Sequence, residues 1–258
     1  MTLTTIRSEV SPRGIATVTL DRPGQLNAFN QTMLGEIDGE LKRLASEADV
    51  RLLIVRAAGK HFSSGADMAR PAAAEGEVKH TGFVDIFSTL ARFAKPSIVA
   101  VQGACVGGAA AFVGCFDLVL AEEAAFFSIP EVRIGVAPIG VTPVLVRAMG
   151  LANYRRHALS GERFTAAEAH RCGLVDEVHA PDGMAAAIER AAEAFLLGGP
   201  GALAGLKAHL AAAYPQLIDE LEAARAHHAR VDTFKTPEAL EGVAAFKEKR
   251  KPNWYPPR

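Results

Sequence analysis

The chain has few of the residues on which several common folds and sites depend. Its 258 residues include three cysteines, Cys105, Cys115 and Cys172, an odd number without C-x-x-C spacing. Structural disulfides and thiolate zinc sites are therefore not expected. Histidine, aspartate, glutamate and cysteine nowhere show the sequence spacing of a metal site. Ser63 and Ser64 lack a surrounding Gly-x-Ser-x-Gly segment, which argues against a serine hydrolase.

The chain also lacks a strong net charge and a long apolar run. Its 28 lysines and arginines nearly balance 29 aspartates and glutamates, which gives a formal net charge of −1. We therefore expect no nucleic acid and no membrane as partner. The longest apolar runs are shorter than a membrane span, and the N-terminus lacks the charged-then-apolar layout of a signal peptide. We expect a cytoplasmic protein.

The remaining composition, 49% hydrophobic and 22% charged residues, is typical of a globular protein that buries a large core. Apolar β-branched runs alternate with helical patterns over the first two thirds of the chain, which predicts a layered α/β core. Strands are expected at residues 16–21, 52–55, 97–102, 117–121 and 125–128, and extended chain at 174–178. Helices are expected after Asn30, at 84–93, 109–112, 144–149 and 154–159, and from Thr165 to Gly173.

Beyond Asp182 the pattern is almost entirely helical. Helices are predicted at residues 184–197, 202–213, 217–231 and 237–247, the last capped by Thr236 with Pro237 in its first turn. We assign residues 1–198 to the α/β core and residues 199–258 to a helical C-terminal region, which packs on the core or on a neighbouring subunit. Residues 69–80 show no clear period and are predicted to form a loop that flanks a ligand.

The segment from Lys95 to Phe112 joins a strand-like run to a glycine turn and a helix-like run. Gly103 and the pair Gly107-Gly108 follow the strand. A strand that ends in glycines and opens into a helix leaves backbone N–H groups unpaired at the positive end of the helix dipole. Such a turn binds an anion, either a phosphate or a developing oxyanion, or it serves close packing alone. A phosphate loop is the weaker interpretation, because no Gly-Lys-Ser/Thr follows.

Further motifs occur around this turn in a specific order. Leu20-Asp-Arg-Pro-Gly-Gln-Leu-Asn-Ala28 and Ser64-Gly-Ala-Asp67 precede it, and Pro130-Glu131 follows it. With these motifs the chain resembles the enoyl-CoA hydratase/isomerase (crotonase) superfamily nearly end to end. The resemblance implies a crotonase-like core of repeated β-β-α units with a C-terminal helical oligomerisation region. It also implies an acyl-CoA substrate, a homo-oligomer that is a trimer or a dimer of trimers, and no metal or cofactor apart from the coenzyme A of the substrate.

The resemblance assigns an oxyanion hole to the backbone amides of Ala66 and Gly108. In the superfamily two such donors hold the thioester carbonyl and stabilise the enolate that forms from it. Asp67 is expected to order this loop rather than to contact substrate, and Arg22 is the candidate for the CoA phosphates. Substrate contacts are implied for Arg22, Leu26, Ala28, His61, Ser64, Gly65, Met68, Gly107 and Ala111.

Glu131 is the candidate catalytic acid and base. A solvated glutamate at a turn is the ordinary alternative. However, Phe127, Ile129 and Val132 give it an apolar setting. Burial in such a setting raises a carboxyl pKa towards neutrality, which suits proton transfer. By the resemblance, Glu131 matches the second catalytic glutamate of the superfamily.

The sequence departs from the best-known hydratases of the superfamily at Ala111, where they carry a glutamate. A single carboxylate still moves a proton between two carbons, as in enoyl-CoA isomerases. Yet the segment from Pro130 to Pro138, followed by Thr142-Pro-Val, resembles a hydratase subgroup that acts on branched glutaconyl-type CoA esters and lacks the same carboxylate. We favour a hydratase, a lyase, over an isomerase. A non-catalytic acyl-CoA-binding homologue is the third alternative, and the acyl group stays open.

Overall fold

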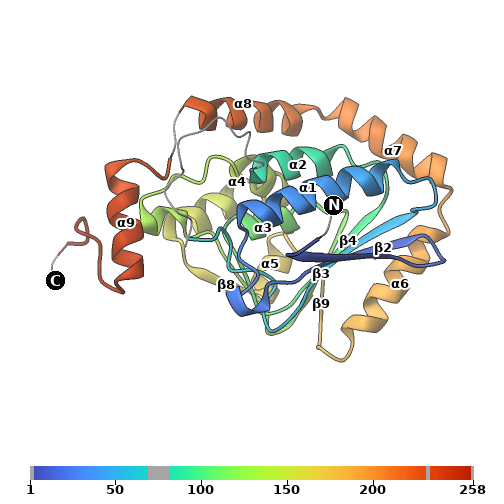
Figure 1. Ribbon diagram of the computed structural model, residues 1–258, viewed down its shortest axis with the longest axis horizontal. Coiled ribbons are helices and arrows are strands. Elements are labelled where there is room, and N and C mark those ends of the chain that lie inside the picture. Colours follow the sequence, from blue (N-terminus) through green and yellow to red (C-terminus); the bar gives the residue numbers. More distant parts are fainter. Residues whose placement is uncertain (1–2, 69–81, 231–232, 257–258) are drawn as a thin grey trace.

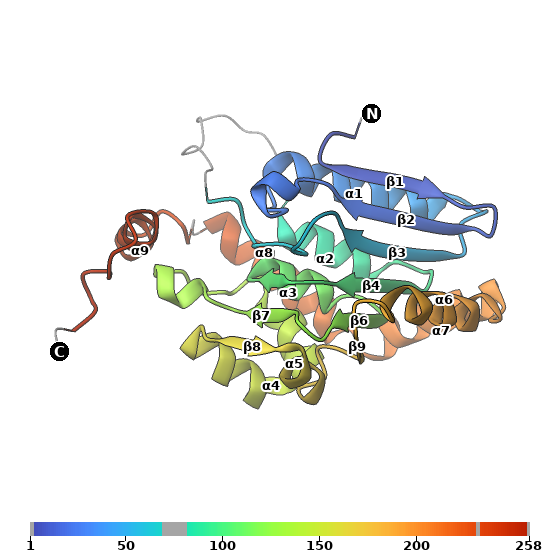
Figure 2. The same ribbon diagram turned by 90° about the horizontal axis from the view of Figure 1, so that it is seen from below.

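The computed structural model describes residues 3–68, 82–230 and 233–256, so the loop expected at residues 69–80 lies outside the described residues. A six-stranded sheet in the order β1-β2-β3-β4-β6-β9 forms its centre (Figures 1 and 2). Only β1 and β2 pair antiparallel in it. The strands are β1 (Ile6–Val10), β2 (Ile15–Leu20), β3 (Leu52–Ala57), β4 (Ser97–Val101), β6 (Leu118–Glu122) and β9 (Glu177–His179).

A smaller sheet contains β5 (Ala104–Val106), β7 (Phe126–Ser128) and β8 (Arg163–Thr165) in that order. Strand β5 pairs parallel with β7, and β8 pairs antiparallel with β7. The sequence pattern predicted β7 but neither β5 nor β8. Strand β5 continues directly from β4 towards the glycine turn, so the two sheets meet where the candidate site was expected.

Helices cover both faces of the large sheet (Figure 1). On one face lie α1 (Gln31–Ser46), α2 (Phe83–Ala91) and α3 (Gly108–Val113), and on the other lies α6 (Met184–Leu196). Alternate residues of β3 pack on opposite faces of the sheet. Leu53 and Val55 belong to the larger apolar cluster, and Leu52 and Ile54 pack in a second cluster with α6. This alternation follows from the two-residue period of a strand, and the layered α/β core is confirmed.

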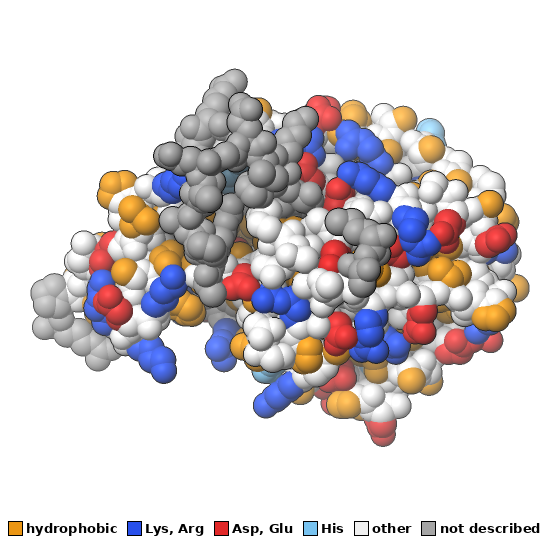
Figure 3. Space-filling view, viewed as in Figure 1, with side chains coloured by type: hydrophobic (Ala, Val, Ile, Leu, Met, Phe, Trp, Pro, Cys, Tyr) orange, Lys and Arg blue, Asp and Glu red, His pale blue; other side chains and the backbone are white. Residues whose placement is uncertain are grey.

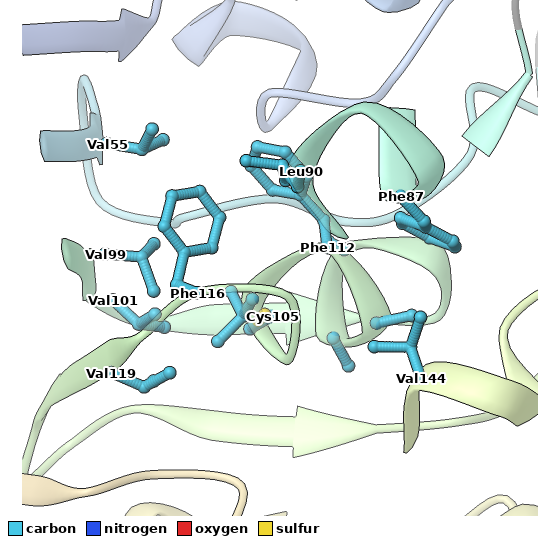
Figure 4. Close-up of a cluster of buried hydrophobic side chains, with 14 of the residues drawn as sticks. Val55, Phe87, Leu90, Val99, Val101, Cys105, Phe112, Phe116, Val119 and Val144 are labelled. Atoms are coloured by element: carbon cyan, nitrogen blue, oxygen red, sulfur yellow. The ribbon is translucent and has the colours of Figure 1, made fainter. Parts of the chain in front are cut away.

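The larger cluster sits directly beneath α3. Val99 and Val101 of β4 and Val119 of β6 lie on the side of Phe112 in α3 and of Phe116, which follows this helix (Figure 4). The aromatic rings of Phe112 and Phe116 meet edge to face, with centroids 5.2 Å apart. Because α3 is short, this packing fixes its position on the sheet and with it the position of its N-terminal turn.

Helix α4 (Thr142–Ser160) contains the two short helices expected at 144–149 and 154–159 as its two pieces. Gly150 interrupts it with non-helical backbone, φ 75° and ψ 151°, so the two pieces are joined across a kink at the position where the pattern broke. Helix α5 (Ala166–Arg171) follows, and Thr165 caps it by accepting a hydrogen bond from the Glu168 N–H at 3.2 Å, as predicted.

The C-terminal helices are α7 (Pro200–Ala213), α8 (Gln216–Arg230) and α9 (Pro237–Lys247). Helix α8 packs on α2, where Arg225 and Asp85 form an ion pair of 3.0 Å. Helix α9 lies at one end of the molecule (Figure 1), against a short 3-10 turn, η2 (Glu131–Ile134). Its bounds and its Thr236 cap are as the sequence predicted.

Charges of both signs are interspersed over the face drawn in Figure 3, consistent with a net charge of −1. The described part of the chain holds no helix of the length and apolarity that a membrane span needs.

Candidate active site

Two loops that carry candidate site residues leave the same edge of the large sheet. Val55 of β3 pairs in parallel with Val99 of β4, so the segments that follow these strands lie side by side. The Ser63 N–H donates to the Ala104 carbonyl at 2.9 Å, and the Val106 N–H donates to the Ser63 carbonyl at 3.1 Å. This local pairing brings the loop of Ala66 next to the turn of Gly108, although more than 40 residues separate them in the sequence.

Glycine is required where these two loops touch. Gly65 has a φ of +90°, and a Cβ there would lie 2.7 Å from the carbonyl oxygen of Val106. Gly107, with a φ of +59°, lies on the other side of the contact. Side chains of L-residues rarely adopt this backbone conformation, and a contact of 2.7 Å with backbone has no simple relief. The two loops therefore approach each other backbone to backbone.

The predicted oxyanion donors have no hydrogen-bond acceptor among the described residues, whereas their neighbours do. The amides of Gly65, Asp67 and Gly107 donate to Ser63 Oγ at 3.1 Å, Phe29 O at 3.1 Å and Ser128 O at 2.8 Å, respectively. The Ala66 amide lies between two of these satisfied groups, and the Gly108 amide follows that of Gly107 and begins α3. Two unpaired donors on adjacent backbone segments are what an oxyanion hole requires.

The Glu131 side chain lies against the same turn. A Cβ at Gly107 would be 2.7 Å from Glu131 Oε1, so the carboxyl group lies directly against the backbone of this turn. Burial raises the pKa of Glu131 to about 7, and the backbone N–H of the same residue partly opposes the shift. Oε2 is buried and has no hydrogen-bond partner among the described residues. A buried carboxyl group that titrates near neutrality serves as both proton acceptor and proton donor.

A pair of hydroxyl groups lies near Glu131. The Thr142 Oγ1 and Tyr154 hydroxyl oxygens are 2.5 Å apart, and both residues belong to α4. Burial raises the pKa of Tyr154, the hydrogen bond to Thr142 opposes this, and the charge of Glu131 adds a further upward contribution. The sequence interpretation used Thr142 only as part of a motif and did not identify Tyr154.

Asn27 holds the first motif against the oxyanion loop, a role that the sequence reasoning missed. Its fully buried side chain donates from Nδ2 to the carbonyls of Ala58 and His61, both at 2.9 Å. Its Oδ1 accepts from the Arg22 backbone N–H at 2.8 Å. Asn27 and Leu26 have φ values of 51° and 52°. Asparagine tolerates this left-handed conformation better than most residues, which is the one signal that the sequence offered.

Arg22 and Asp67 form an ion pair. Arg22 Nη1 lies 3.1 Å from Asp67 Oδ2, and the two side chains are only 15% and 19% exposed. Arg22 also donates to the Ala28 carbonyl. Through this ion pair Asp67 anchors the loop of Ala66 to the first motif. That Asp67 orders the loop rather than contacts substrate stays a prediction. The assignment of Arg22 to the CoA phosphates stays a prediction.

The other implied contact residues lie at different depths around this loop. His61 is held by its Nδ1, which accepts from the Ala104 N–H at 3.1 Å. Leu26 is half exposed at the rim, and the Ser64 N–H donates to its carbonyl at 3.0 Å. Ala28 is buried, and Met68 is partly exposed at the end of a described segment. Substrate contact by these residues stays a prediction.

Ala111 and Phe83 border the N-terminal turn of α3. Ala111 is fully buried in the larger apolar cluster, so its methyl group packs in the core. Phe83, the first residue of α2, covers Gly108: a Cβ at Gly108 would lie 2.6–2.8 Å from three atoms of its ring. The surroundings of the Gly108 amide are therefore apolar, and hydrogen bonds are stronger in apolar surroundings than in water.

One group of side chains in the described residues has the proximity, though not the sequence spacing, of a metal site. Potential ligand atoms of His157, Glu168 and Cys172 lie within 4.8 Å of one another. The Arg171 guanidinium bonds Glu168 through both carboxylate oxygens and holds its pKa at about 2. Arg156 lies 3.6 Å from the same carboxylate. Two arginines already neutralise Glu168, so the local charge disfavours a cation.

Comparison with known proteins identifies the family and the fold. The family model for enoyl-CoA hydratase/isomerase matches residues 11–256. A probable enoyl-CoA hydratase of Rhodobacter capsulatus is 35% identical over 98% of this chain and 99% of its own. The 2,3-dehydroadipyl-CoA hydratase of Escherichia coli is 29% identical over 92% and 93%. The structure of an enoyl-CoA hydratase from Mycobacterium avium subsp. paratuberculosis superposes with a TM-score of 0.86 at 27% identity, over 99% of this chain and 100% of that one. The crotonase fold expected from the sequence is thus confirmed, and the chain belongs to the enoyl-CoA hydratase/isomerase family.

Proposed function

We propose that the protein is an enoyl-CoA hydratase, in which the amides of Ala66 and Gly108 hold the thioester oxygen and Glu131 transfers the protons. The observation that carries this proposal is the position of one buried carboxyl group, with a pKa of about 7, beside a glycine turn whose next amide has no acceptor among the described residues. The hydratase names of the relatives support the same assignment.

The proposed reaction needs only the thioester, water and these groups. The ionised Glu131 carboxylate accepts a proton from water while the water oxygen bonds to Cβ of the enoyl group. The electrons of the Cα–Cβ double bond move onto the thioester oxygen, where the two amides stabilise the enolate. The protonated Glu131 then returns the proton to Cα. The product is a 3-hydroxyacyl-CoA, and Glu131 is ionised again.

Coenzyme A is proposed to lie along the rim formed by Leu26 and Ala28 and by the loop from His61 to Gly65. The acyl group then points from the oxyanion hole towards the ring of Phe83. The half-exposed Leu26 side chain and the aromatic cover of Gly108 support this direction, since one end of the site is open and the other is apolar.

The second candidate function is an enoyl-CoA isomerase. Ala111 favours it, because a hydratase with two carboxylates divides water activation and protonation between them, whereas an isomerase moves one proton between two carbons with one carboxylate. Both reactions pass through the same enolate, so the oxyanion hole serves either. A non-catalytic acyl-CoA-binding protein would have no need of a buried carboxyl group with a raised pKa.

Product analysis separates these functions. The purified protein is incubated with straight and branched 2-enoyl-CoA esters and with 3-enoyl-CoA esters, and the products are identified by mass. Formation of 3-hydroxyacyl-CoA from a 2-enoyl-CoA supports the hydratase. Conversion of 3-enoyl to 2-enoyl esters without addition of water would replace it by the isomerase. Binding without any product would indicate the non-catalytic homologue.

We also propose that the chain forms a trimer or a hexamer. Several large apolar side chains are exposed on the C-terminal helices, among them Leu206 and Leu210 of α7 and Leu240 and Phe246 of α9. Such side chains are commonly covered by a second copy in homo-oligomers. Sedimentation or light scattering at micromolar concentration is expected to give three or six times the 27.3 kDa chain mass. A monomer at that concentration would refute this.

A further inference from the structure

The turn that carries Glu131 has little core packing of its own. The 3-10 turn η2 consists of four residues, Glu131–Ile134, none of which is fully buried. A single turn of this kind is stabilised by few internal hydrogen bonds. Its position must therefore come from the elements that touch it. One of these is α4, since Arg133 Nε donates to the Ser160 carbonyl at 3.0 Å.

A second element that touches η2 is α9, and no side chain lies between the two backbones at their contact. A Cβ at Gly242 of α9 would lie 2.4 Å from both the carbonyl carbon and the oxygen of Ile134. On the opposite side, Gly135 has a φ of +69°, and a Cβ there would lie 2.6 Å from the Glu238 carbonyl oxygen. A glycine on each partner thus permits direct backbone contact. We call this contact the η2–α9 seam.

Helix α9 presents its small residues to this seam. Ala239, the alanine nearest to Gly135, and Ala245 are fully buried, together with Gly242 between them. Leu240 and Phe246 are 59% and 62% exposed. The orientation of α9 is therefore set by its smallest residues, which allow the closest approach to η2. Its large apolar side chains are not what hold it there.

Contacts of η2 connect the seam with the turn of Gly107. Glu131 Oε1 lies so close to Gly107 that a Cβ there would be 2.7 Å away. Three residues further along η2, the Ile134 backbone meets Gly242. The turn of Glu131 is thus held between the N-terminus of α3 and α9, which are more than 120 residues apart in the sequence. A displacement of α9 therefore moves the carboxyl group relative to the oxyanion donors.

We propose that α9 positions the active site: through the η2–α9 seam, Gly242 and Gly135 hold the turn of Glu131 against Gly107. This inference rests on the proposed role of Glu131 in proton transfer. Gly242 and Gly135 are proposed to act through the turn of Glu131, so they are positioning residues. The C-terminal helix thereby contributes to the alignment of the acid–base group as well as to the outer surface of the protein.

The first test compares Gly242→Ala with Gly205→Ala. Both replace a helical glycine, but a Cβ at Gly205 of α7 meets nothing within 4 Å. Alanine favours the helix at either position, so only the seam distinguishes the two variants. We expect Gly242→Ala to lower kcat about 10-fold with little change in KM, because a small displacement of a catalytic group slows the chemical step more than it weakens substrate binding. Gly205→Ala should match the wild type.

The pH dependence supplies a readout that a general loss of stability would not change. A seam that opens lets water reach the Glu131 carboxyl group, so its pKa falls from about 7 towards the ordinary value of 4.5. On the acidic side of the profile, kcat/KM should therefore decline at a lower pH in Gly242→Ala than in the wild type and in Gly205→Ala. Arg133 and Tyr154 beside the turn, and Glu238 and Glu241 on α9, are unchanged in this variant.

A second pair approaches the seam from η2. Gly135→Ala is compared with Gly150→Ala, because both glycines have positive φ but only the first meets another segment. Wild-type kcat and pH profile in folded Gly242→Ala and Gly135→Ala would overturn the proposal. So would loss of folding in both while the controls fold, since the seam would then maintain the fold rather than the site. If Glu131→Gln retains activity, the proposed function fails instead.

Discussion

Replacement of Glu131 by glutamine is expected to lower kcat by at least ~100-fold while acyl-CoA affinity changes little, because general acid–base catalysis contributes at least that much. Glutamine preserves the shape of the side chain beside Gly107 but neither accepts nor donates the proton. The carboxyl group lies in a buried setting that raises its pKa to about 7, and a neutral amide costs less to bury there than an ionised carboxylate. Steady-state kinetics and calorimetric binding measure the two quantities separately.

Glu123→Gln is the matched control, because Glu123 is exposed on the turn between β6 and β7. It should show wild-type kcat. If Glu131→Gln retained most of the activity, or if both variants lost it equally, Glu131 would not be the acid–base group. A loss confined to affinity would instead place Glu131 among the binding residues.

Replacement of Gly65 by alanine is expected to lower kcat/KM by roughly 100-fold, the effect seen when one oxyanion donor is lost. The added Cβ would lie 2.7 Å from the Val106 carbonyl oxygen, and the φ of +90° is strained for alanine. Relief of the close contact or of the backbone strain requires the two loops to separate. The Ala66 amide then moves away from the Gly108 amide, and the enolate loses part of its stabilisation while ground-state binding changes less.

Gly150→Ala controls for strain alone, since Gly150 also has a positive φ, +75°, but a Cβ there meets nothing within 4 Å. Both variants should unfold at lower temperature than the wild type, and only Gly65→Ala should lose activity when assayed well below its melting temperature. Equal activities in the two variants would show that the contact between the loops does not align the oxyanion donors.

Local signals predicted the elements well where a cap and a periodic apolar face coincide. Asn30 caps α1 by accepting from the Met33 N–H at 2.9 Å, and Thr236 caps α9, both as expected. Strands β1, β5 and β8 were missed: β5 and β8 have only three residues each, and the polar residues of β1 hide its strand pattern. The break that the pattern predicted within residues 142–160 is present, because Gly150 interrupts α4 with non-helical backbone.

The order of the motifs predicted which loops form the site, but not how they are held. The hydrogen bonds of Asn27 and the ion pair of Arg22 with Asp67 join segments that are 31 to 45 residues apart. The η2–α9 seam joins segments more than 100 residues apart. Such contacts depend on the assembled fold, and a glycine in the sequence does not say which backbone will approach it.

Hydrogen exchange at the α carbon tests the central claim most directly, because it reports enolate formation without net turnover. A saturated acyl-CoA ester such as butyryl-CoA is incubated with the protein in heavy water, and deuterium at Cα is followed by mass or NMR. The account predicts exchange with the wild type and none above background with Glu131→Gln, although both bind the ester. Exchange that persists in Glu131→Gln, or its absence in a wild-type protein that binds, would contradict the claim that Glu131 transfers a proton at a carbon beside an oxyanion hole.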